Sequence, residues 1–368
     1  MNTIKVPQAK RVWFITDTHL GVRNNSNEWI EIMEDYFFKW FFPLVREHYK
    51  PGDVLIHCGD WFDSRQSVNL KVLNLGVSIA EEMSNIFKDG VHILIGNHDI
   101  WGKNSNDVNS LKSIKWIPGF NIHEEPGSLN LGNRSFFMMP WRKDQEAETQ
   151  CLIDAHDHDY LCCHADIKGL NFNKFVKIEH GIEEQYLKKF KKIYSGHIHY
   201  SQDYKNVKML GSPYQLTRSD MGNTKGITLL DLSDDSEKFF ENKFSPKFQK
   251  IDFNRVLEMT IADASYVFSN NFVDILIDPK MALRAPLNIL TDEVTTPRKI
   301  SFHPHDPNQA GLLSDKIRDT DGSHFSVMDF IDAYVDGLEY DDQTKSKLIR
   351  SIKALHNSVA NQNGENSL

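Results

Sequence analysis

Five short polar clusters in the first 200 residues carry the side chains that could do chemistry. Their Asp, Asn and His side chains offer oxygen and imidazole ligands. Such a mixture is typical of manganese, iron or zinc in an active site and not of a structural zinc cage. These candidates are too many for one catalytic ion with an open position, whereas seven ligands fit two ions that share a bridging carboxylate. Two cations about 3.5–4 Å apart can clamp the attacking and leaving oxygens of a phosphoryl transfer. The clusters are Asp17-Thr18-His19, Gly59-Asp60-Trp61-Phe62-Asp63, Gly96-Asn97-His98-Asp99, His164 and Gly196-His197-Ile198-His199.

Each cluster taken alone has a simpler structural interpretation, because Gly and Asp are common in turns and caps. Asp17-Thr18-His19 and Gly59–Asp63 are weak signals for this reason, while Gly96–Asp99 and Gly196–His199 are more specific. In the last cluster the two histidines are alternate residues, which share a face on an extended segment. All five clusters in this order favour a metal site over five unrelated turns.

A short apolar, β-rich run precedes each cluster, and such runs are typical of strands buried on both faces. Helical patterns of apolar residues lie between the early runs, at Trp29–Val45 and Val72–Phe87. Alternating strands and helices predict an α/β architecture. Ligand sites of open α/β sheets form at the carboxyl ends of strands, so the distant clusters can converge in space. The predicted strands are Val12–Ile15, Val54–Ile56, Val91–Ile95, Phe136–Met139, Tyr160–Cys163, Lys192–Tyr194, Val207–Leu210 and Ile227–Leu230.

The pattern changes after about residue 240. Residues 251–277 predict one or two strands around a polar turn, and residues 282–323 are rich in Pro, Asp, Asn and His, which favours a linker. Two apolar stripes, Val327–Leu338 and Leu348–Val359, predict a helical hairpin close to the C-terminus.

The chain has 368 residues, enough for two or three domains, with 42 basic and 51 acidic residues and a net charge of −9. This balance excludes binding to DNA or membrane by bulk positive charge. Residues 301–368 carry 11 acidic and 6 basic residues, which is more than half of the acidic excess. Four cysteines without a paired spacing, no apolar leader and no run of 18 apolar residues predict a cytoplasmic protein with no membrane segment.

The order of the five clusters resembles that of the calcineurin-like metallophosphoesterase superfamily, over about residues 10–235. Within that superfamily, Asp17–Gly21, Gly59–Arg65, Ser195–His199 and Gly211-Ser212-Pro213-Tyr214-Gln215 are similar to motifs of the SbcD-type DNA repair nucleases. The chain length, the stretch 164–181 and the helical C-terminal pattern look most like the nuclease subunits of phage recombination. The resemblance implies an α/β fold, a four-layer αββα sandwich with a small α+β capping domain and a C-terminal helical segment.

The same resemblance implies an activity and a set of partners. The activity is that of an exonuclease or endonuclease in DNA recombination, repair and replication, in the host bacterial cytoplasm if the chain is phage-encoded. The partners are double- and single-stranded DNA, an SMC-like ATPase bound through the C-terminal helices, and a second copy of the chain in a homodimer. The expected parts are a nuclease domain at 1–240, a capping and DNA-binding domain at 241–300, a linker at 301–323 and a partner-binding helical segment at 324–360.

Carried over residue by residue, the resemblance gives a site for two divalent metal ions, Mn²⁺ in the first place, with Mg²⁺, Fe²⁺ or zinc also compatible. His98 would face the substrate, stabilising the developing charge or protonating the leaving oxygen. Asp99 would orient His98 or cap the backbone. Asp63 stands where some members have a second His, and we expect it to orient a ligand or to bind Arg65. Asp17, His19 and His199 would hold one ion, Asn97, His164 and His197 would hold the other, and Asp60 would bridge them.

The segment 168–192 holds seven Lys and three acidic residues, with four aromatic residues interleaved. Together with Arg65, its residues Lys168, Lys174 and Lys177 could form a phosphate-tracking surface next to the site. The alternative is a solvated helix face, which fits Lys188, Lys189, Lys191 and Lys192. The helical C-terminal pair could likewise pack on its own domain instead of a partner. The rival functions are a small-substrate phosphomonoesterase or cyclic-nucleotide phosphodiesterase, and a non-catalytic scaffold on the same fold.

Overall fold

The computed structural model describes residues 3–102, 106–155, 158–277, 297–304, 335, 341 and 343–351, and the statements below refer to these residues. The chain divides into two compact units, Met1–Pro246 and Lys247–Leu368, each of which is considered by itself. Most of the predicted linker at 301–323 and most of the predicted helical segment at 324–360 lie outside the described residues. Within that segment, residues 343–351 are helical.

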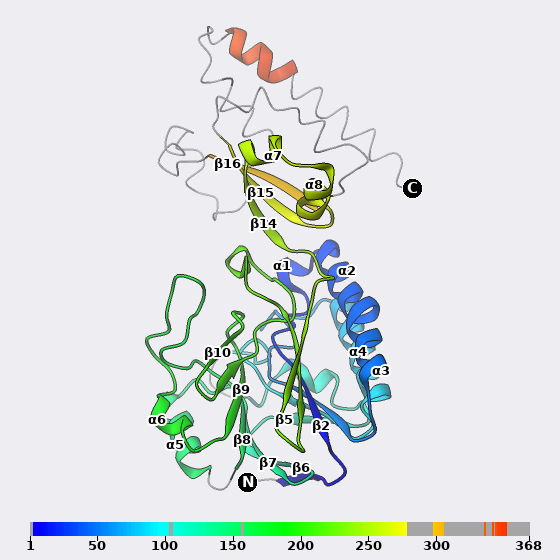
Figure 1. Cartoon of the computed structure of the whole chain (residues 1–368), viewed down its shortest axis with the longest axis vertical. Coiled ribbons are helices and arrows are strands. Elements are labelled where there is room, and N and C mark those ends of the chain that lie inside the picture. The colour runs from blue at the N-terminus through cyan, green and yellow to red at the C-terminus, as the bar shows by residue number, and fades with distance from the viewer. Residues whose placement is uncertain are drawn as a thin grey trace. The chain divides into compact units, whose positions relative to one another are not determined.

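Two β-sheets form the centre of the first unit (Figure 1). All eight strands predicted from the sequence are present. In spatial order the seven-stranded sheet consists of β1 (Thr3–Val6), β6 (Gly127–Leu131), β7 (Arg134–Met139), β8 (Tyr160–His164), β9 (Lys192–Gly196), β11 (Val207–Met209) and β10 (Gln202–Tyr204). The six-stranded sheet consists of β13 (Glu237–Glu241), β12 (Gly226–Asp231), β2 (Arg11–Ile15), β3 (Asp53–His57), β4 (Val91–Leu94) and β5 (Phe120–His123). Neighbouring strands β2, β3, β4 and β5 run parallel, as do β7, β8 and β9, so each group has its carboxyl ends at one edge.

The two sheets pack face to face, and their inner faces share one apolar core. Val12, Phe14 and Val54 of the six-stranded sheet are fully or almost fully buried in it, together with Phe136 of the opposite sheet. The ring of Phe14 stacks on Tyr194 across the layers, with 4.0 Å between ring centroids. The predicted strands are apolar at consecutive positions because they are covered on both faces.

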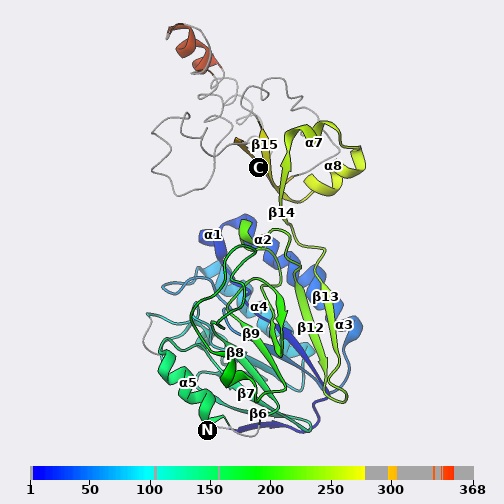
Figure 2. The same ribbon diagram turned by 60° about the vertical axis from the view of Figure 1, so that its left-hand side comes forward.

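Helices cover the outer faces and complete four layers, which confirms the predicted αββα sandwich (Figures 1 and 2). On one side are α2 (Asn27–Asp35), α3 (Phe42–His48) and α4 (Leu70–Ile86), and on the other are α5 (Gln145–Asp154) and α6 (Glu184–Leu187). A short helix, α1 (Val22–Asn25), precedes α2. No helix in the described part of the chain is long and apolar enough to cross a membrane.

The helix predicted at Trp29–Val45 is one helical stretch from Asn27 to His48 with a π-helical segment, Tyr36–Phe41, in its middle. The Ser26 hydroxyl begins it by accepting the N–H of Trp29. Apolar periodicity alone does not distinguish a π segment from an α-helix, so the sequence predicted a single α-helix here.

The second unit contains a parallel three-stranded sheet, β14 (Phe248–Asp252), β15 (Phe272–Ile277) and β16 (Lys299–Pro304), with α7 (Phe253–Leu257) and α8 (Ile261–Phe268). The polar turn predicted inside residues 251–277 is wrong, because this stretch holds both helices. The side chains of Thr260 and Asp263 form a capping box that begins α8. Strand β16 also runs across the boundary expected at residue 300, since it pairs with β15 over its whole length.

Candidate metal centre

The five polar clusters meet at one end of the sandwich, because each follows the carboxyl end of a parallel strand. Clusters after β2, β3 and β4 come from the six-stranded sheet, and those at the ends of β8 and β9 come from the seven-stranded sheet. The structure therefore brings together side chains that are up to 182 positions apart in the chain, as predicted from the strand ends.

Four of the predicted ligand residues have a left-handed backbone, which non-glycine residues rarely adopt. The φ angles are 50° at Asp17, 44° at His19, 58° at Asp60 and 85° at His197. Hydrogen bonds between the two loops hold these conformations: the N–H of Asp17 donates to the Gly59 carbonyl at 3.0 Å, and that of His19 donates to the Asp60 carbonyl at 3.1 Å. Backbone strain of this kind is typical of functional sites, where surrounding contacts fix it.

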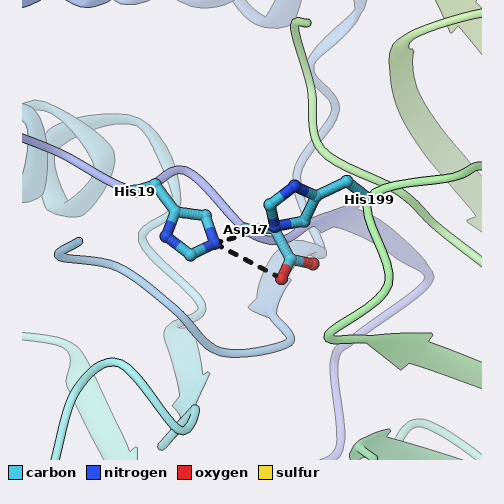
Figure 3. A group of neighbouring side chains, drawn as sticks. All are labelled: Asp17, His19 and His199. Carbon is cyan, nitrogen blue, oxygen red and sulfur yellow. Dashed lines mark hydrogen bonds and ion pairs between the residues drawn. The ribbon is translucent and has the colours of Figure 1, made fainter. Parts of the chain in front are cut away.

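Asp17, His19 and His199 form the first group of converging donors (Figure 3). Their donor atoms all lie within 4.8 Å of one another. The Nε2 atom of His19 is 3.8 Å from a carboxylate oxygen of Asp17 and 3.0 Å from Nε2 of His199. Asp17 and His19 are buried, so water does not compete for these donors.

The second group contains Asp60, His164 and His197, with the amide of Asn97 between the two imidazoles. Nε2 of His164 lies 3.3 Å from Oδ2 of Asp60. Oδ1 of Asn97 lies 2.9 Å from the same His164 nitrogen and 2.8 Å from Nδ1 of His197. One oxygen from the loop after β4, one nitrogen from the end of β8 and one nitrogen from the loop after β9 thus lie next to one another.

Asp60 connects the two groups. Its Oδ2 atom lies 3.4 Å from Nε2 of His19, a member of the first group, and 3.3 Å from Nε2 of His164, a member of the second. Its other oxygen accepts the backbone N–H of His98 at 2.8 Å. This is the position that a bridging carboxylate requires, and it places the predicted bridge between the predicted ligands.

The electrostatics of the two groups fit bound cations. Burial raises the pKa of Asp60, but the imidazoles of His164, His19 and His98 outweigh burial and hold that pKa well below its usual range. Burial likewise lowers the pKa of His19, but Asp17, Asp63 and Asp60 raise it to about 10. The Asp60 carboxylate, with smaller contributions, similarly raises the pKa of His164 to about 9 against the effect of burial. Buried carboxylates that draw protons onto their neighbours provide the negative charge and the donor atoms that divalent cations need.

Three ligand imidazoles are held through the ring nitrogen that faces away from the donor groups. Nδ1–H of His19 donates to a carboxylate oxygen of Asp63 at 3.0 Å, and Nδ1–H of His164 donates to the Cys58 carbonyl at 2.7 Å. Nε2 of His197 lies 3.3 Å from Asp166. Such partners fix the tautomer and the orientation of metal-binding imidazoles. Of the two contacts expected for Asp63, the structure shows the one with the predicted ligand His19.

Asp166 and the pair Asp220–Lys225 were missed in the sequence. Asp166 stands two positions after His164, and this His-x-Asp spacing was the available signal. Lys225 is buried, pairs with Asp220 at 2.8 Å and donates to the backbone carbonyl of His199. No local pattern marks a lysine that is buried by tertiary structure, so only the fold reveals this support.

His98 lies at the edge of the donor groups, with about a third of its side chain exposed. Nδ1–H of its ring donates to the backbone carbonyl of Asp63 at 2.6 Å, which fixes the ring plane. Burial lowers the pKa of His98, and the neighbouring His19 lowers it further. The ring borders a pocket of about 210 Å³, which is also lined by Asp60 and Asn97.

Asp99 does not orient His98 and has the alternative role of a backbone cap. Its carboxylate accepts the N–H groups of Gly96 (2.9 Å), Asp60 (2.9 Å), Trp61 (3.0 Å) and Phe62 (3.2 Å). It therefore ties the loop after β3 to the loop after β4. Within the described residues, the His98 ring donates to the Asp63 carbonyl, while the Asp99 carboxylate accepts N–H groups of the loop after β3.

The predicted DNA-binding residues are spread over two loops. Arg65 is half-buried, while Lys168, Lys174 and Lys177 are exposed between β8 and α6. The alternative of a solvated helix face is correct in part: Lys188, Lys189 and Lys191 are exposed, but α6 ends at Leu187, so these lysines do not lie along a helix. Lys188 pairs with Glu184, Lys191 with Asp235, and Lys192 with Asp203 and Glu237, while Lys189 donates to the Leu152 carbonyl.

The chain is similar to several known proteins. Among curated proteins, Exonuclease subunit 1 of Enterobacteria phage T4 is 26% identical over 232 residues. That match covers 61% of this chain and 66% of the phage protein, so it spans slightly less than two thirds of the relative's length.

Solved structures also match. An archaeal phosphodiesterase has 13% identity and a TM-score of 0.34, with 63% of this chain and 99% of that chain covered. A protein of unknown function from Aquifex aeolicus has 17% identity and a TM-score of 0.25, with 51% and 94% covered. The model of the calcineurin-like phosphoesterase family matches residues 10–234, a range that contains every donor described above. The chain belongs to the calcineurin-like phosphoesterase family.

Proposed function

We propose that the chain is a metal-dependent DNA nuclease, the nuclease subunit of a complex with an SMC-like ATPase in DNA recombination, repair and replication. The observation that carries the metal-dependent chemistry is the pair of donor groups joined by Asp60. Family membership supports a phosphoesterase that uses divalent metal ions. The phage relative, which is named as an exonuclease subunit, supports DNA as the substrate and a protein partner.

The ligands that we assign are those of the two groups. Asp17, His19 and His199 would hold one divalent ion, Asn97, His164 and His197 would hold the other, and Asp60 would contact both. We propose Mn²⁺ as the ion. When bound, the two ions supply Lewis acidity, which acidifies a water molecule and neutralises the phosphate oxygens.

The residues of the chain contribute position and hydrogen bonds. His98 is fixed at Nδ1 by the Asp63 carbonyl, so Nε2 is the nitrogen that can reach a substrate oxygen in the pocket. There it can stabilise developing charge or pass a proton to the leaving oxygen. Asp99 contributes indirectly, since it holds the loop that carries Asp60.

The pocket next to His98 has a volume of about 210 Å³, which leaves room for the reacting part of a DNA strand. A phosphate and part of its sugar would enter, while the rest of the substrate would lie outside. The exposed Lys168, Lys174 and Lys177, and the half-buried Arg65, are the groups that we propose to contact the outer phosphates.

The partner contacts are proposals of the same kind. The ATPase would bind the helical segment 324–360, and two copies of the chain would pair in a homodimer, in the cytoplasm of the host bacterium. Deleting the residues after Ser323 should abolish ATPase binding and leave basal Mn²⁺-dependent cleavage. Loss of both together would count against a separate partner-binding segment.

A substrate panel tests the function. The wild-type chain with Mn²⁺, with and without the ATPase partner, is given single- and double-stranded DNA, a phosphomonoester and a cyclic nucleotide. We expect DNA cleavage that the His98→Ala variant loses while it still binds two ions. Turnover of the small phosphoesters with intact DNA would identify the rival phosphatase or cyclic-nucleotide activity. Failure of the wild type to bind two ions would favour a non-catalytic scaffold.

A further inference from the structure

A short hairpin, residues 171–177, lies between β8 and β9 in the chain and is fixed by its own hydrogen bonds. Its ends pair in an antiparallel bridge, and the N–H of Phe172 donates to the Val176 carbonyl at 2.8 Å. At the turn, Oδ1 of Asn173 accepts the N–H groups of Phe175 (2.8 Å) and Val176 (3.0 Å). The hairpin therefore has a defined shape without support from a bound molecule.

The base of the hairpin is attached to the sandwich. Leu170 and Ile178, which flank it, are buried in the core on the outer face of the seven-stranded sheet. The side chain of Gln202 in β10 accepts the N–H of Asn171 at 2.9 Å and donates to its carbonyl at 2.6 Å. The tip is thus held in a constant position relative to the metal centre.

The tip presents apolar side chains to solvent next to the catalytic pocket. Phe172 is 54% exposed and Phe175 is 88% exposed. Phe172 and Asn173 also line the pocket that contains Asp60 and His98. Aromatic rings held in water beside a site for phosphate chemistry indicate a surface that a substrate covers.

The charge of the hairpin fits a polyanion. Residues 168–178 contain three lysines and no acidic residue. Lys168 pairs with Glu183 at 3.6 Å, whereas Lys174 and Lys177 have no ion-pair partner among the described residues. The ammonium of Lys174 lies 5.9 Å from the centre of the Phe175 ring, so a cation and an aromatic face are presented together.

We propose that residues 171–177 bind single-stranded DNA, with unpaired bases stacked on Phe172 and Phe175 and the neighbouring phosphates on Lys174 and Lys177. Every base has a π face, so stacking on aromatic side chains is tolerant of sequence. In a duplex both faces of a base are already covered by its neighbours, so the hairpin selects strands whose bases are unstacked. This inference rests on the proposed nuclease function and adds the form of DNA that enters the pocket.

The test compares two strands with the same phosphate backbone, one with all its bases and one made of abasic nucleotides. Their affinity for the full-length chain is measured by fluorescence anisotropy in EDTA, where turnover stops. The wild type should bind the base-bearing strand roughly ten- to a hundredfold more tightly than the abasic strand. Phe172→Ala/Phe175→Ala should lose most of this preference, with the affinity for the abasic strand unchanged.

Phe239→Ala is the matched control, because Phe239 is 40% exposed on β13 of the other sheet. It should keep the full preference for bases. Phe175→Ala alone removes a ring that is almost entirely exposed, so a reduced preference in this variant cannot result from misfolding. An unchanged preference in both Phe variants, while the wild type cleaves DNA, would overturn the inference and leave the nuclease function intact. A wild type that neither binds nor cleaves DNA would overturn the nuclease function itself.

Discussion

Metal loading at pH 7 should release about two protons per chain. In the metal-free protein, neighbouring carboxylates raise the pKa of His19 to about 10 and that of His164 to about 9, despite burial. Both imidazoles are therefore protonated at pH 7. A metal ligand must be a neutral imidazole, so each of these histidines gives up one proton when the ions bind.

The other predicted ligands with shifted pKa values, His199, Asp17 and Asp60, contribute no protons. The release expected at pH 7 therefore comes from His19 and His164. Burial and His19 lower the pKa of His199 to about 4, and the imidazoles around Asp17 lower its pKa to about 2 although burial raises it. At pH 9 the release should be smaller, because this pH is closer to the pKa values of both histidines, which are then partly deprotonated before the ions bind.

Isothermal titration of the chain with Mn²⁺, in two buffers of equal pH and different ionisation enthalpy, measures the number of protons released. His19→Gln serves as the comparison, because it should bring the release at pH 7 down to about one for the remaining ion. A release well below one proton in the wild type at pH 7 would refute the reasoning. So would a release that stays constant between pH 7 and pH 9.

Three further outcomes are expected. In EDTA, urea denaturation should show that the free energy of unfolding falls as the pH rises from 7 to 10. The raised pKa values of His19 and His164 stabilise the fold fully below pH 6.5, and this stabilisation is lost as the pH rises through 9–10. Its size is up to several kcal/mol, at about 1.4 kcal/mol per pKa unit, and a flat profile would contradict it. Asp63→Ala and Asp166→Ala should each weaken Mn²⁺ binding roughly ten- to a hundredfold in calorimetry, because each frees one ligand ring; wild-type affinity in both would dismiss their orienting role. Lys225→Met should reduce the free energy of unfolding by about 3–5 kcal/mol, since it leaves the Asp220 carboxylate buried without its cation. Lys225→Met/Asp220→Asn should regain much of this, because the amide oxygen can still accept the N–H groups of Leu216 and Thr217 while the buried charge is gone; equal melting temperatures for both variants would argue against a buried ion pair.

The strands and the convergence of the ligands followed from the sequence because both depend on local patterns. Val54–Ile56 and Tyr160–Cys163 are apolar at successive positions, and a strand covered on both faces has that pattern wherever it lies. Polar clusters directly after such strands then share one edge of the sheet. Strand β6, which lies between β1 and β7, was missed because it alternates buried and half-buried residues, which gives a weaker signal than a continuous apolar run.

What the sequence could not supply is the direction of individual side chains. Asp99 follows His98 in the chain, so adjacency suggested that one orients the other. The left-handed backbone of Asp60 instead brings successive N–H groups of that loop to the Asp99 carboxylate. In the second unit, helix α8 was missed because it is only eight residues long, too short for a clear helical period, and its beginning depends on the Thr260 capping box.

The two sheets supply the metal donors jointly: Asp17, His19 and Asp60 come from one, and His164 and His197 from the other. A bound ion would therefore cross-link two layers that otherwise touch through apolar side chains. Each ion favours the assembled sandwich by about 2.7 kcal/mol at a free concentration a hundred times its dissociation constant. During synthesis the two donor groups cannot be completed until β9 has left the ribosome and paired with β8. A chain that stops before the end of β9 therefore lacks His197 and His199, one donor of each group.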